Sequence, residues 1–198
     1  MISALLEDAC VEHGSRAGGL VTRKAVMRDI PSILNLINGY AARGIMLPRT
    51  EFEMSEAIRD FTVVTRGDEF LGCGALHFYS PTFGEIRSLA VPEKAKTQGA
   101  GRRLVEALVA EAQMYELDAV FAFTYVLGFF NKLGFQEVER GVLPLKAWKD
   151  CLRCPKFQAC DEIAVLRVLR PQAWAETQPQ IWPSEGDQYI QIPTSRSR

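Results

Sequence analysis

A turn that contains two glycines, between a strand and a helix, is the part of this sequence best suited to bind an anion. The apolar run Leu89-Ala90-Val91-Pro92 predicts the end of a strand, and an amphipathic helix begins soon afterwards, at Gly99 and Gly101. In such a turn several backbone N–H groups point at one ligand, and the helix dipole adds about half a positive charge. The spacing Gly99-x-Gly101 matches neither the dinucleotide motif G-x-G-x-x-G nor a Walker loop. We therefore expect this turn to hold a phosphate-bearing ligand.

A cluster of three cysteines is the second group with recognisable chemistry. Cys151, Cys154 and Cys160 supply three thiols, whereas structural zinc usually takes four ligands. Asp161, a distant histidine, another chain or water would have to complete the set. We expect reduced thiols that order a loop, and no bound metal. Because the first twenty residues lack a signal-peptide pattern, disulfides are not expected either.

The composition limits the classes of protein to which the chain can belong. It has 198 residues, of which 47% are hydrophobic and 24% charged, enough for one domain with a substantial core. The 23 basic and 24 acidic side chains give a net charge of -1, which favours neither nucleic acid nor a membrane surface as a partner. No apolar run reaches the ~20 residues of a spanning helix. We expect a cytoplasmic protein with a small-molecule partner.

Hydrophobic periodicity and turn residues predict one mixed domain over residues 20–169. Residues 1–19 are expected to form a flexible leader, residues 141–161 an insertion that contains the cysteines, and residues 170–198 a disordered tail. The predicted strands are 20–26, 61–65, 69–79, 84–91, 119–124, 136–140 and 162–169. The predicted helices are 29–44, 50–59, 101–116 and 127–133.

The first two of these helices begin at residues suited to cap them. Asp29 precedes the first helix, and Pro31 follows in its first turn, where the missing N–H costs nothing. Thr50 and Glu53 have the spacing of a capping box for the second helix. We therefore expect side-chain caps at both positions.

The order of these elements and the glycine turn together resemble the GNAT acetyltransferases. The resemblance covers about residues 20–169, and its most specific part is the loop Lys96-Thr97-Gln98-Gly99-Ala100-Gly101, which follows the family pattern R/Q-x-x-G-x-G/A except at Lys96. It implies an α+β (mixed α/β) GNAT fold, with a mostly antiparallel mixed sheet flanked by helices. It also implies acetyl-CoA as co-substrate, with its pyrophosphate on the backbone of this loop. The residues implied to bind acetyl-CoA are Leu89, Ala90, Val91, Lys96, Thr97, Gln98, Gly99, Ala100, Gly101, Arg102 and Asn131.

Four segments are similar to a narrower group within that family, the short bacterial N-acetylglutamate synthases. They are Gly44 to Arg49, Gly84 to Val91, and the pair Trp148 to Cys151 and Cys154 to Phe157. The similarity implies transfer of acetyl from acetyl-CoA to L-glutamate, the first step of arginine biosynthesis, without the amino-acid-kinase domain of the longer enzymes. L-glutamine as acceptor and assembly as a homodimer are left open.

Acetyl transfer from a thioester requires an uncharged amine, so a base must take a proton from the glutamate ammonium group. Glu85, at the start of the central strand, is the candidate, directly or through a water; the alternative is a solvated strand-end carboxylate. Backbone N–H groups near Leu89 to Val91 would stabilise the oxyanion, as the resemblance implies. Phe130 stands where many GNAT enzymes have a tyrosine that acts as the general acid and protonates the departing CoA thiolate. Either Tyr125 substitutes for it or solvent protonates CoA.

The two carboxylates of glutamate each need a cation or several N–H donors. Arg49 is the first candidate, with Leu47 contributing backbone only; the alternative is a surface arginine. Arg87 shares a strand face with Glu85. It is expected either to bind the second carboxylate of the substrate or to form an ion pair with Glu85. Ser88 can contact the same substrate only if the strand bulges between the two residues. Tyr125 stands where longer synthases carry a second arginine.

Two rival functions use the same glycine loop. One is a GNAT enzyme that acetylates another small amine, an antibiotic or a protein N-terminus. The other is a noncatalytic acyl-CoA sensor, which would be favoured if Glu85 pointed into solvent. His77 lies within an apolar strand and is expected to be a structural histidine.

Overall fold

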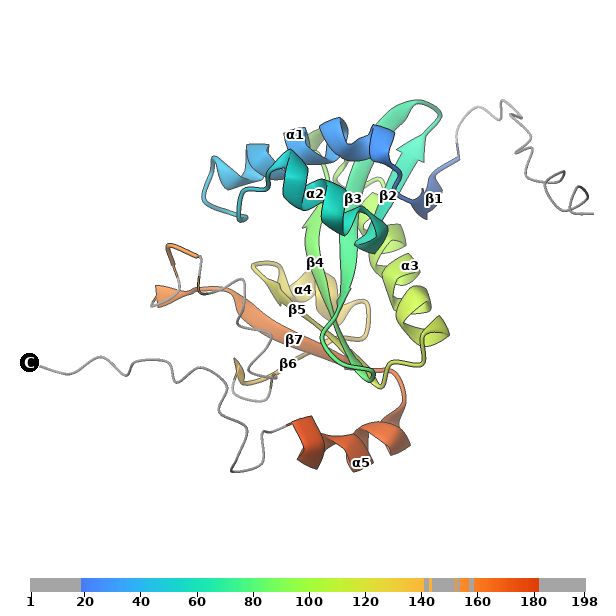
Figure 1. Ribbon diagram of the computed structural model, residues 1–198, viewed down its shortest axis with the longest axis vertical. Helices are drawn as coiled ribbons and strands as arrows, with labels where there is room; N and C mark the ends of the chain where they lie inside the picture. Colours follow the sequence, from blue (N-terminus) through green and yellow to red (C-terminus); the bar gives the residue numbers. More distant parts are fainter. Residues whose placement is uncertain (1–18, 141–142, 144–151, 153, 157–158, 182–198) are drawn as a thin grey trace, which may run out of the picture.

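A seven-stranded sheet forms the centre of the computed structural model, which describes residues 19–140, 143, 152, 154–156 and 159–181 (Figure 1). The order of its strands is β1-β2-β3-β4-β5-β7-β6. Neighbouring strands are antiparallel except β4 and β5, which are parallel. The strands are β1 (Val21–Lys24), β2 (Phe61–Arg66), β3 (Glu69–Phe78), β4 (Phe83–Ala90), β5 (Ala119–Thr124), β6 (Gln136–Glu137) and β7 (Ile163–Val168). The predicted α+β fold with a mostly antiparallel mixed sheet is confirmed.

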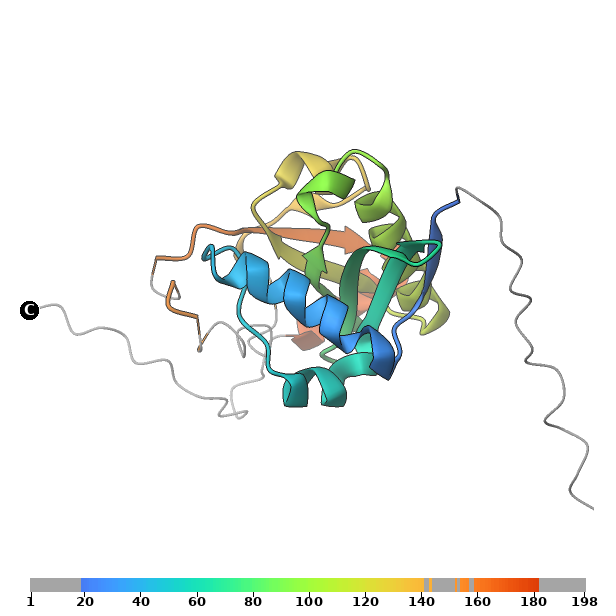
Figure 2. The same ribbon diagram turned by 90° about the horizontal axis from the view of Figure 1, so that it is seen from above.

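Helices cover both faces of this sheet (Figure 2). The first pair, on one face, is α1 (Ile30–Ala41) and α2 (Glu51–Ala57), and the second pair, on the other face, is α3 (Ala100–Met114) and α4 (Leu127–Asn131). Three short 3-10 turns also occur, η1 (Met27–Asp29), η2 (Ile58–Asp60) and η3 (Glu93–Ala95). None of the described helices combines the length and apolar composition that crossing a membrane requires.

Alternation along the strands divides the core into two layers. Leu76 and Ile86 pack with Leu108 of α3 in one layer, whereas Ala75 packs with Ile37 of α1 in the other. Each of these strands therefore presents every second residue to the face covered by α1 and α2. The alternation decides which side chains of β4 lie close together on that face.

The two central strands separate after a short parallel ladder. Only three pairs join β4 to β5, and the last of them is Glu85 with Phe121. Beyond this pair β4 continues to Ala90 and β5 to Thr124 without pairing to one another. In Figure 1 β4 rises toward α1, whereas β5 runs with β7 to the left. The separation leaves the later backbone groups of β4 open to a ligand on that side.

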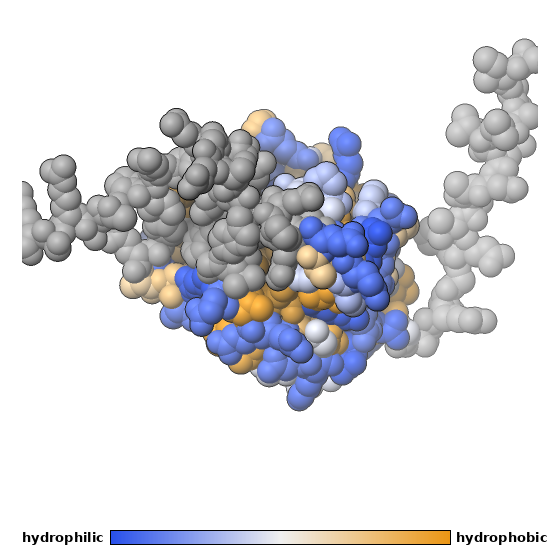
Figure 3. Space-filling view, turned by 90° about the horizontal axis from the view of Figure 1, so that it is seen from below, coloured by the Kyte–Doolittle hydropathy of each residue, from blue (hydrophilic) through white to orange (hydrophobic). Residues whose placement is uncertain are grey.

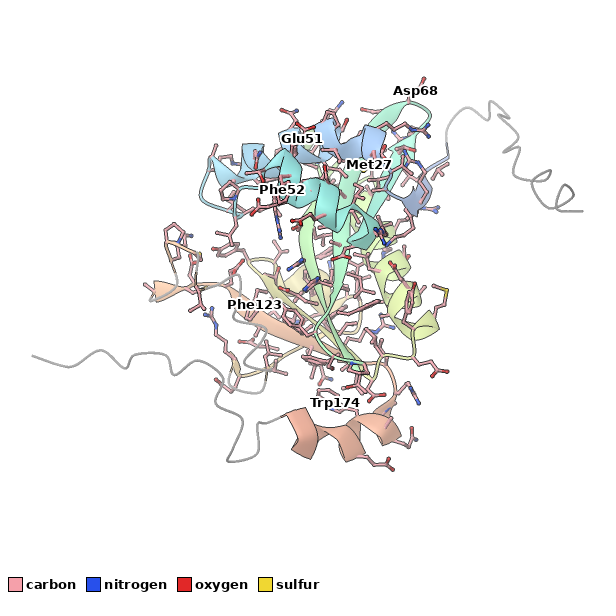
Figure 4. The ribbon with its side chains drawn as sticks, viewed as in Figure 1. Met27, Glu51, Phe52, Asp68, Phe123 and Trp174 are labelled. Carbon is pink, nitrogen blue, oxygen red and sulfur yellow. The ribbon has the colours of Figure 1, made fainter. Side chains whose placement is uncertain are left out.

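The end of the described chain departs from the sequence prediction. Helix α5 (Pro171–Ile181) occupies residues that were predicted to be a disordered tail, so the prediction is wrong there. Trp174 is 7% exposed, lies between α5 and the sheet (Figure 4), and stacks on Phe83 with ring centroids 5.5 Å apart. Trp174 thus attaches to the core a helix whose overall composition resembles a linker. Residues 1–18 and 182–198, and most of 141–161, lie outside the described residues.

The predicted caps have different outcomes. At α2 the Glu53 N–H donates to Thr50 Oγ1 at 3.2 Å, and the Thr50 N–H donates to Glu53 Oε2 at 2.8 Å, which confirms the capping box. Asp29 lies at the N-cap of α1 but makes no side-chain cap bond there. Its carboxylate pairs with Arg23 at 2.6 Å and accepts the Val26 N–H at 2.8 Å. The hydrogen bond from Arg23 lowers the pKa of Asp29. The Asp29 side chain therefore links β1 to the start of α1 and does not cap the helix.

Candidate active site

Glu85 lies on the face of β4 that is turned toward α1 and α2. Ile86 belongs to the core under α3, so Glu85 and Arg87 on either side of it share the opposite face. Glu85 is only 8% exposed, and the Tyr79 hydroxyl donates a hydrogen bond to its Oε2 atom at 3.0 Å. Glu85 is therefore a buried, oriented carboxylate rather than a solvated strand-end group.

Asp60 and His77 extend this group of polar side chains. The Oδ2 atom of Asp60, at the end of η2, is 3.0 Å from His77 Nδ1 and 3.9 Å from Arg87 Nη2. His77 is also the Cα partner of Glu85 in the β3–β4 ladder. We call Asp60, His77, Tyr79, Glu85 and Arg87 the β4 polar cluster. His77 has the partner expected of a structural histidine, yet it lies beside the candidate base. Both interpretations of Arg87 remain predictions.

A β-bulge changes the direction of β4 just beyond the cluster. The register of the β3–β4 ladder shifts opposite Gly74, and Ser88 has a positive φ of 52° there. A Cβ on Gly74 would lie 3.1 Å from Leu89 Cδ1, so the missing side chain makes room for the bulge. The bulge that Arg87 and Ser88 would need to contact one substrate is present.

Cys73 lies beneath the bulge as a structural residue. Its Sγ donates to the Ser88 carbonyl oxygen at 3.8 Å, and its side chain is fully buried against the α1/α2 core. Burial raises the pKa of the Cys73 thiol to about 12, so the thiol stays protonated at neutral pH. A nucleophilic role for Cys73 is excluded on these grounds.

The glycine turn has the geometry of an anion site. Thr97 and Gly99 have positive φ values of 74° and 85°, and Gly99 is the N-cap of the 15-residue helix α3. The first N–H that bonds back into the helix is that of Arg103, to the Gly99 carbonyl. The N–H groups of Gly99 to Arg102 therefore have no intrahelical acceptor and can bind an anion at the positive end of the helix dipole.

The side chain of Lys96, which departs from the family pattern, does not enter this turn. Its Nζ lies 2.7 Å from Glu93 Oε1 and 5.9 Å from the centre of the Tyr40 ring. The bond to Glu93 raises the pKa of Lys96, so the ammonium stays charged beside the loop. Tyr40 in turn donates to the Val91 carbonyl at 2.6 Å and joins α1 to the end of β4. The pair with Glu93 therefore holds the Lys96 ammonium beside η3.

Arg49 is held in place by an asparagine that sequence reasoning missed. The Asn38 side chain on α1 accepts the Arg49 N–H at 2.9 Å and donates to the Arg49 carbonyl at 2.9 Å. Arg49 is half-buried, as is Leu47 in the same loop. Nothing in the pattern around Asn38 signals this contact, because its partner lies 11 residues away beyond an irregular loop.

The aromatic residues considered as a general acid differ in their surroundings. Phe130 is 3% exposed and packs edge-on against Phe129 and Phe135, as a core residue. Tyr125, just after β5, donates its hydroxyl to Asp161 at 3.0 Å and accepts from Lys156 at 3.2 Å. Burial raises the pKa of Tyr125, which keeps its proton at neutral pH.

Asn131 and the cysteine cluster are the remaining residues that the sequence singled out. Asn131 ends α4 with an exposed side chain. Cys154 and Cys160 are free thiols, whereas Cys151 lies outside the described residues. Within the described ranges no three His, Cys, Asp or Glu side chains are grouped to hold a metal ion. The expectation of reduced thiols without a metal remains a prediction.

Comparison with known proteins adds to this geometry. A family model described as an acetyltransferase (GNAT) domain matches residues 57–137. An uncharacterised N-acetyltransferase of Chlorobaculum tepidum is 41% identical over 153 residues, which are 77% of this chain and 99% of that protein. An amino-acid acetyltransferase of Mycobacterium tuberculosis is 35% identical over 60% of this chain and 70% of its own.

A solved structure agrees with these relatives. The N-acetylglutamate synthase of Neisseria gonorrhoeae, complexed with coenzyme A and N-acetyl-glutamate, superposes with a TM-score of 0.69 at 28% identity. The match covers 78% of this chain and 36% of that one, so the chain spans about a third of the crystallised enzyme.

Proposed function

Because this chain belongs to the GNAT acetyltransferase family, we propose that it transfers the acetyl group of acetyl-CoA to the α-amine of L-glutamate, giving N-acetyl-L-glutamate and CoA. One observation carries the proposal. The carboxylate of Glu85 is buried and oriented on the α1/α2 face, at the last pair before β4 and β5 separate. The names of the relatives support an amino acid as the acceptor, and a place at the first step of arginine biosynthesis follows from that choice.

Acetyl-CoA is the co-substrate, and the chain offers it two sets of backbone donors. The N–H groups of Gly99 to Arg102 would bind the pyrophosphate. The backbone from Leu89 to Val91, beyond the bulge and past the end of the β4–β5 ladder, would meet the pantetheine and the thioester. A donor aimed at the thioester oxygen stabilises the negative charge that develops there.

Glu85 would begin the reaction by accepting a proton from the ammonium group of glutamate. The neutral amine then attacks the thioester carbonyl and the C–N bond forms. The nitrogen gives up a second proton to water, and the C–S bond breaks to release the CoA thiolate. Phe130 is buried and apolar, and the Tyr125 hydroxyl is engaged by Asp161 and Lys156. We therefore assign protonation of the thiolate to solvent, which a thiol of ordinary pKa permits.

Recognition of the acceptor carboxylates would fall to Arg49 and Arg87. A guanidinium can bind a carboxylate through two parallel hydrogen bonds, which fixes both distance and orientation. The backbone of Arg49 is held by Asn38, and the side chain of Arg87 is only 14% exposed, with Asp60 nearby. Ser88, at the bulge, and Leu47, through its backbone, would complete this side of the site.

Release of CoA thiol from acetyl-CoA, measured with a panel of acceptors, tests the proposal. The panel contains L-glutamate, L-glutamine, L-aspartate, a peptide with a free N-terminus, and no acceptor. We expect the highest kcat/KM with glutamate, and N-acetylglutamate identified by mass. Turnover only with another amine would replace glutamate as the acceptor. Binding of acetyl-CoA without turnover on any acceptor would favour the sensor, although a buried Glu85 argues against it.

A further inference from the structure

Tyr79 is a second residue that the geometry brings to the proposed base. It follows β3 in the turn to β4, and its hydroxyl donates to Glu85 Oε2 at 3.0 Å. No sequence motif marks Tyr79, and it takes no part in the proposed proton transfer or in acceptor binding. A hydrogen bond from a neutral donor to a carboxylate stabilises the charged form and restricts rotation of the carboxylate.

The Tyr79 ring is held from several sides, so its hydroxyl has a fixed position. His77 packs edge-on against it, with ring centroids 5.1 Å apart and planes at 89°. The ring of Phe121 on β5 is tilted against it, with ring centroids 5.7 Å apart. The Tyr79 N–H donates to the Phe83 carbonyl at 2.9 Å, which closes the turn. His77 itself is held by Asp60 at 3.0 Å.

We infer that Tyr79 is a positioning residue that orients the Glu85 carboxylate and keeps it ionised for proton abstraction. The inference rests on the proposed function, because it acts through Glu85 as the base. It assigns to the Asp60–His77 pair the supporting task of holding the Tyr79 ring. A base that is already oriented loses less entropy in the transition state, so the effect belongs to kcat rather than to substrate binding.

The charged and titratable groups around Glu85 define the pH dependence that follows. Among the described residues, β3 contributes His77, β4 contributes Arg87, and η2 contributes Asp60, while the neighbour from β5 is the apolar Phe121. Removal of the Tyr79 hydroxyl leaves these groups in place. Any change in the acidic limb of the pH–rate profile can then be assigned to the lost hydrogen bond.

The test is Tyr79→Phe, which keeps the ring and removes only the hydroxyl. We expect kcat for acetyl transfer to glutamate to fall about tenfold, with KM for both substrates within about twofold. The midpoint of the acidic limb of kcat/KM should move upward by about one pH unit. Tyr115→Phe is the matched control, since Tyr115 is exposed at the end of α3, and it should change neither value.

A double-mutant cycle with Glu85→Gln separates the inference from the proposed function. If Tyr79 acts through Glu85, Tyr79→Phe lowers kcat no further once the carboxylate is gone. Full turnover by Glu85→Gln alone would overturn the base assignment and the inference with it. A strong loss in Glu85→Gln, beside an unchanged kcat and pH profile in Tyr79→Phe, would overturn the inference alone. Circular dichroism melting of each variant confirms that the fold is retained.

Discussion

At the scale of single residues, the loop that carries Arg49 is held by hydrogen bonds between a side chain and the backbone. Asn38 satisfies both the N–H and the C=O of Arg49, in the way that a neighbouring strand would. The residues from Gly44 to Arg49 would otherwise connect α1 to α2 as an irregular loop. Asn38 therefore fixes the backbone from which the side chain of Arg49, the proposed carboxylate ligand, extends.

Substitution of Asn38 tests that role. Asn38→Ala removes two half-buried hydrogen bonds, each worth about 1 kcal/mol, and frees the loop that carries Arg49. We expect KM for glutamate to rise about tenfold in steady-state assays, with kcat within about threefold of wild type. Asn35→Ala, on the exposed side of the same helix, should leave both constants unchanged. An unchanged KM in Asn38→Ala would mean that Arg49 does not bind the acceptor.

The candidate site divides into residues that motifs marked and residues that only the fold reveals. Glu85 and the glycine turn could be proposed from the sequence, because residue type and short spacing along the chain mark them, and the structure shows a buried carboxylate and a helix N-terminus at these positions. Asn38, Asp60 and Tyr79 could not, since each acts on a partner brought close by tertiary structure. For such residues one sequence carries no signal that separates a contact from a solvated side chain.

At the scale of elements, the backbone conformation at the start of α3 restricts which residue can occupy position 99. Gly99 has φ of 85°, and a Cβ there would meet nothing within 4 Å. Glycine is therefore required by the backbone conformation and not by lack of space. The N–H groups of the first turn of α3 follow directly and have no intrahelical acceptor.

Gly99→Ala should weaken acetyl-CoA binding without removing the fold. The left-handed conformation costs alanine about 1 kcal/mol, and relaxation of the turn would misdirect the donors of α3. We predict an approximately tenfold higher Kd for acetyl-CoA by calorimetry, with little change in KM for glutamate. Gly39→Ala, within α1 and with open space around it, is the matched control and should bind normally. An unchanged Kd would place the pyrophosphate elsewhere.

Most elements follow from local pattern, and the exceptions have physical reasons. The strand 119–124 is found with the predicted bounds, and the capping box of Thr50 starts α2 as expected. Helix α5 could not be predicted because its sequence has little apolar periodicity, and the stacking of Trp174 on Phe83 depends on tertiary structure. The predicted cap by Asp29 is absent because its carboxylate binds Arg23 of β1 and the Val26 N–H, and not the N–H groups of α1.

At the scale of the molecule, aromatic rings link the last described helix to the polar cluster. Trp174 stacks on Phe83, Phe83 stacks on Phe121 at 4.9 Å, and Phe121 contacts Tyr79. Seen from below, the described surface is mostly hydrophilic with a smaller hydrophobic area between (Figure 3). Helix α5 therefore packs on the same face of β4 as Glu85, at the end of the sheet away from α1 and α2 (Figure 1).

Loss of the Trp174 side chain should lower the stability of the fold. Trp174→Ala removes a large buried ring and should decrease the free energy of unfolding by about 3 kcal/mol in urea titrations. Gln172→Ala, exposed on the same helix, should change it by less than about 0.5 kcal/mol. A Trp174→Ala variant as stable as wild type would show that α5 contributes nothing to the core.

The central claim is that Glu85 abstracts the proton, while acetyl-CoA is bound by other parts of the chain. The most direct measurement compares Glu85→Gln with wild type for two quantities, kcat for acetyl transfer to glutamate and Kd for acetyl-CoA. The account predicts a kcat lower by about 10² to 10⁴, the usual contribution of general base catalysis, with Kd within about twofold. Equal losses in both quantities, or a kcat within a few-fold of wild type, would contradict it.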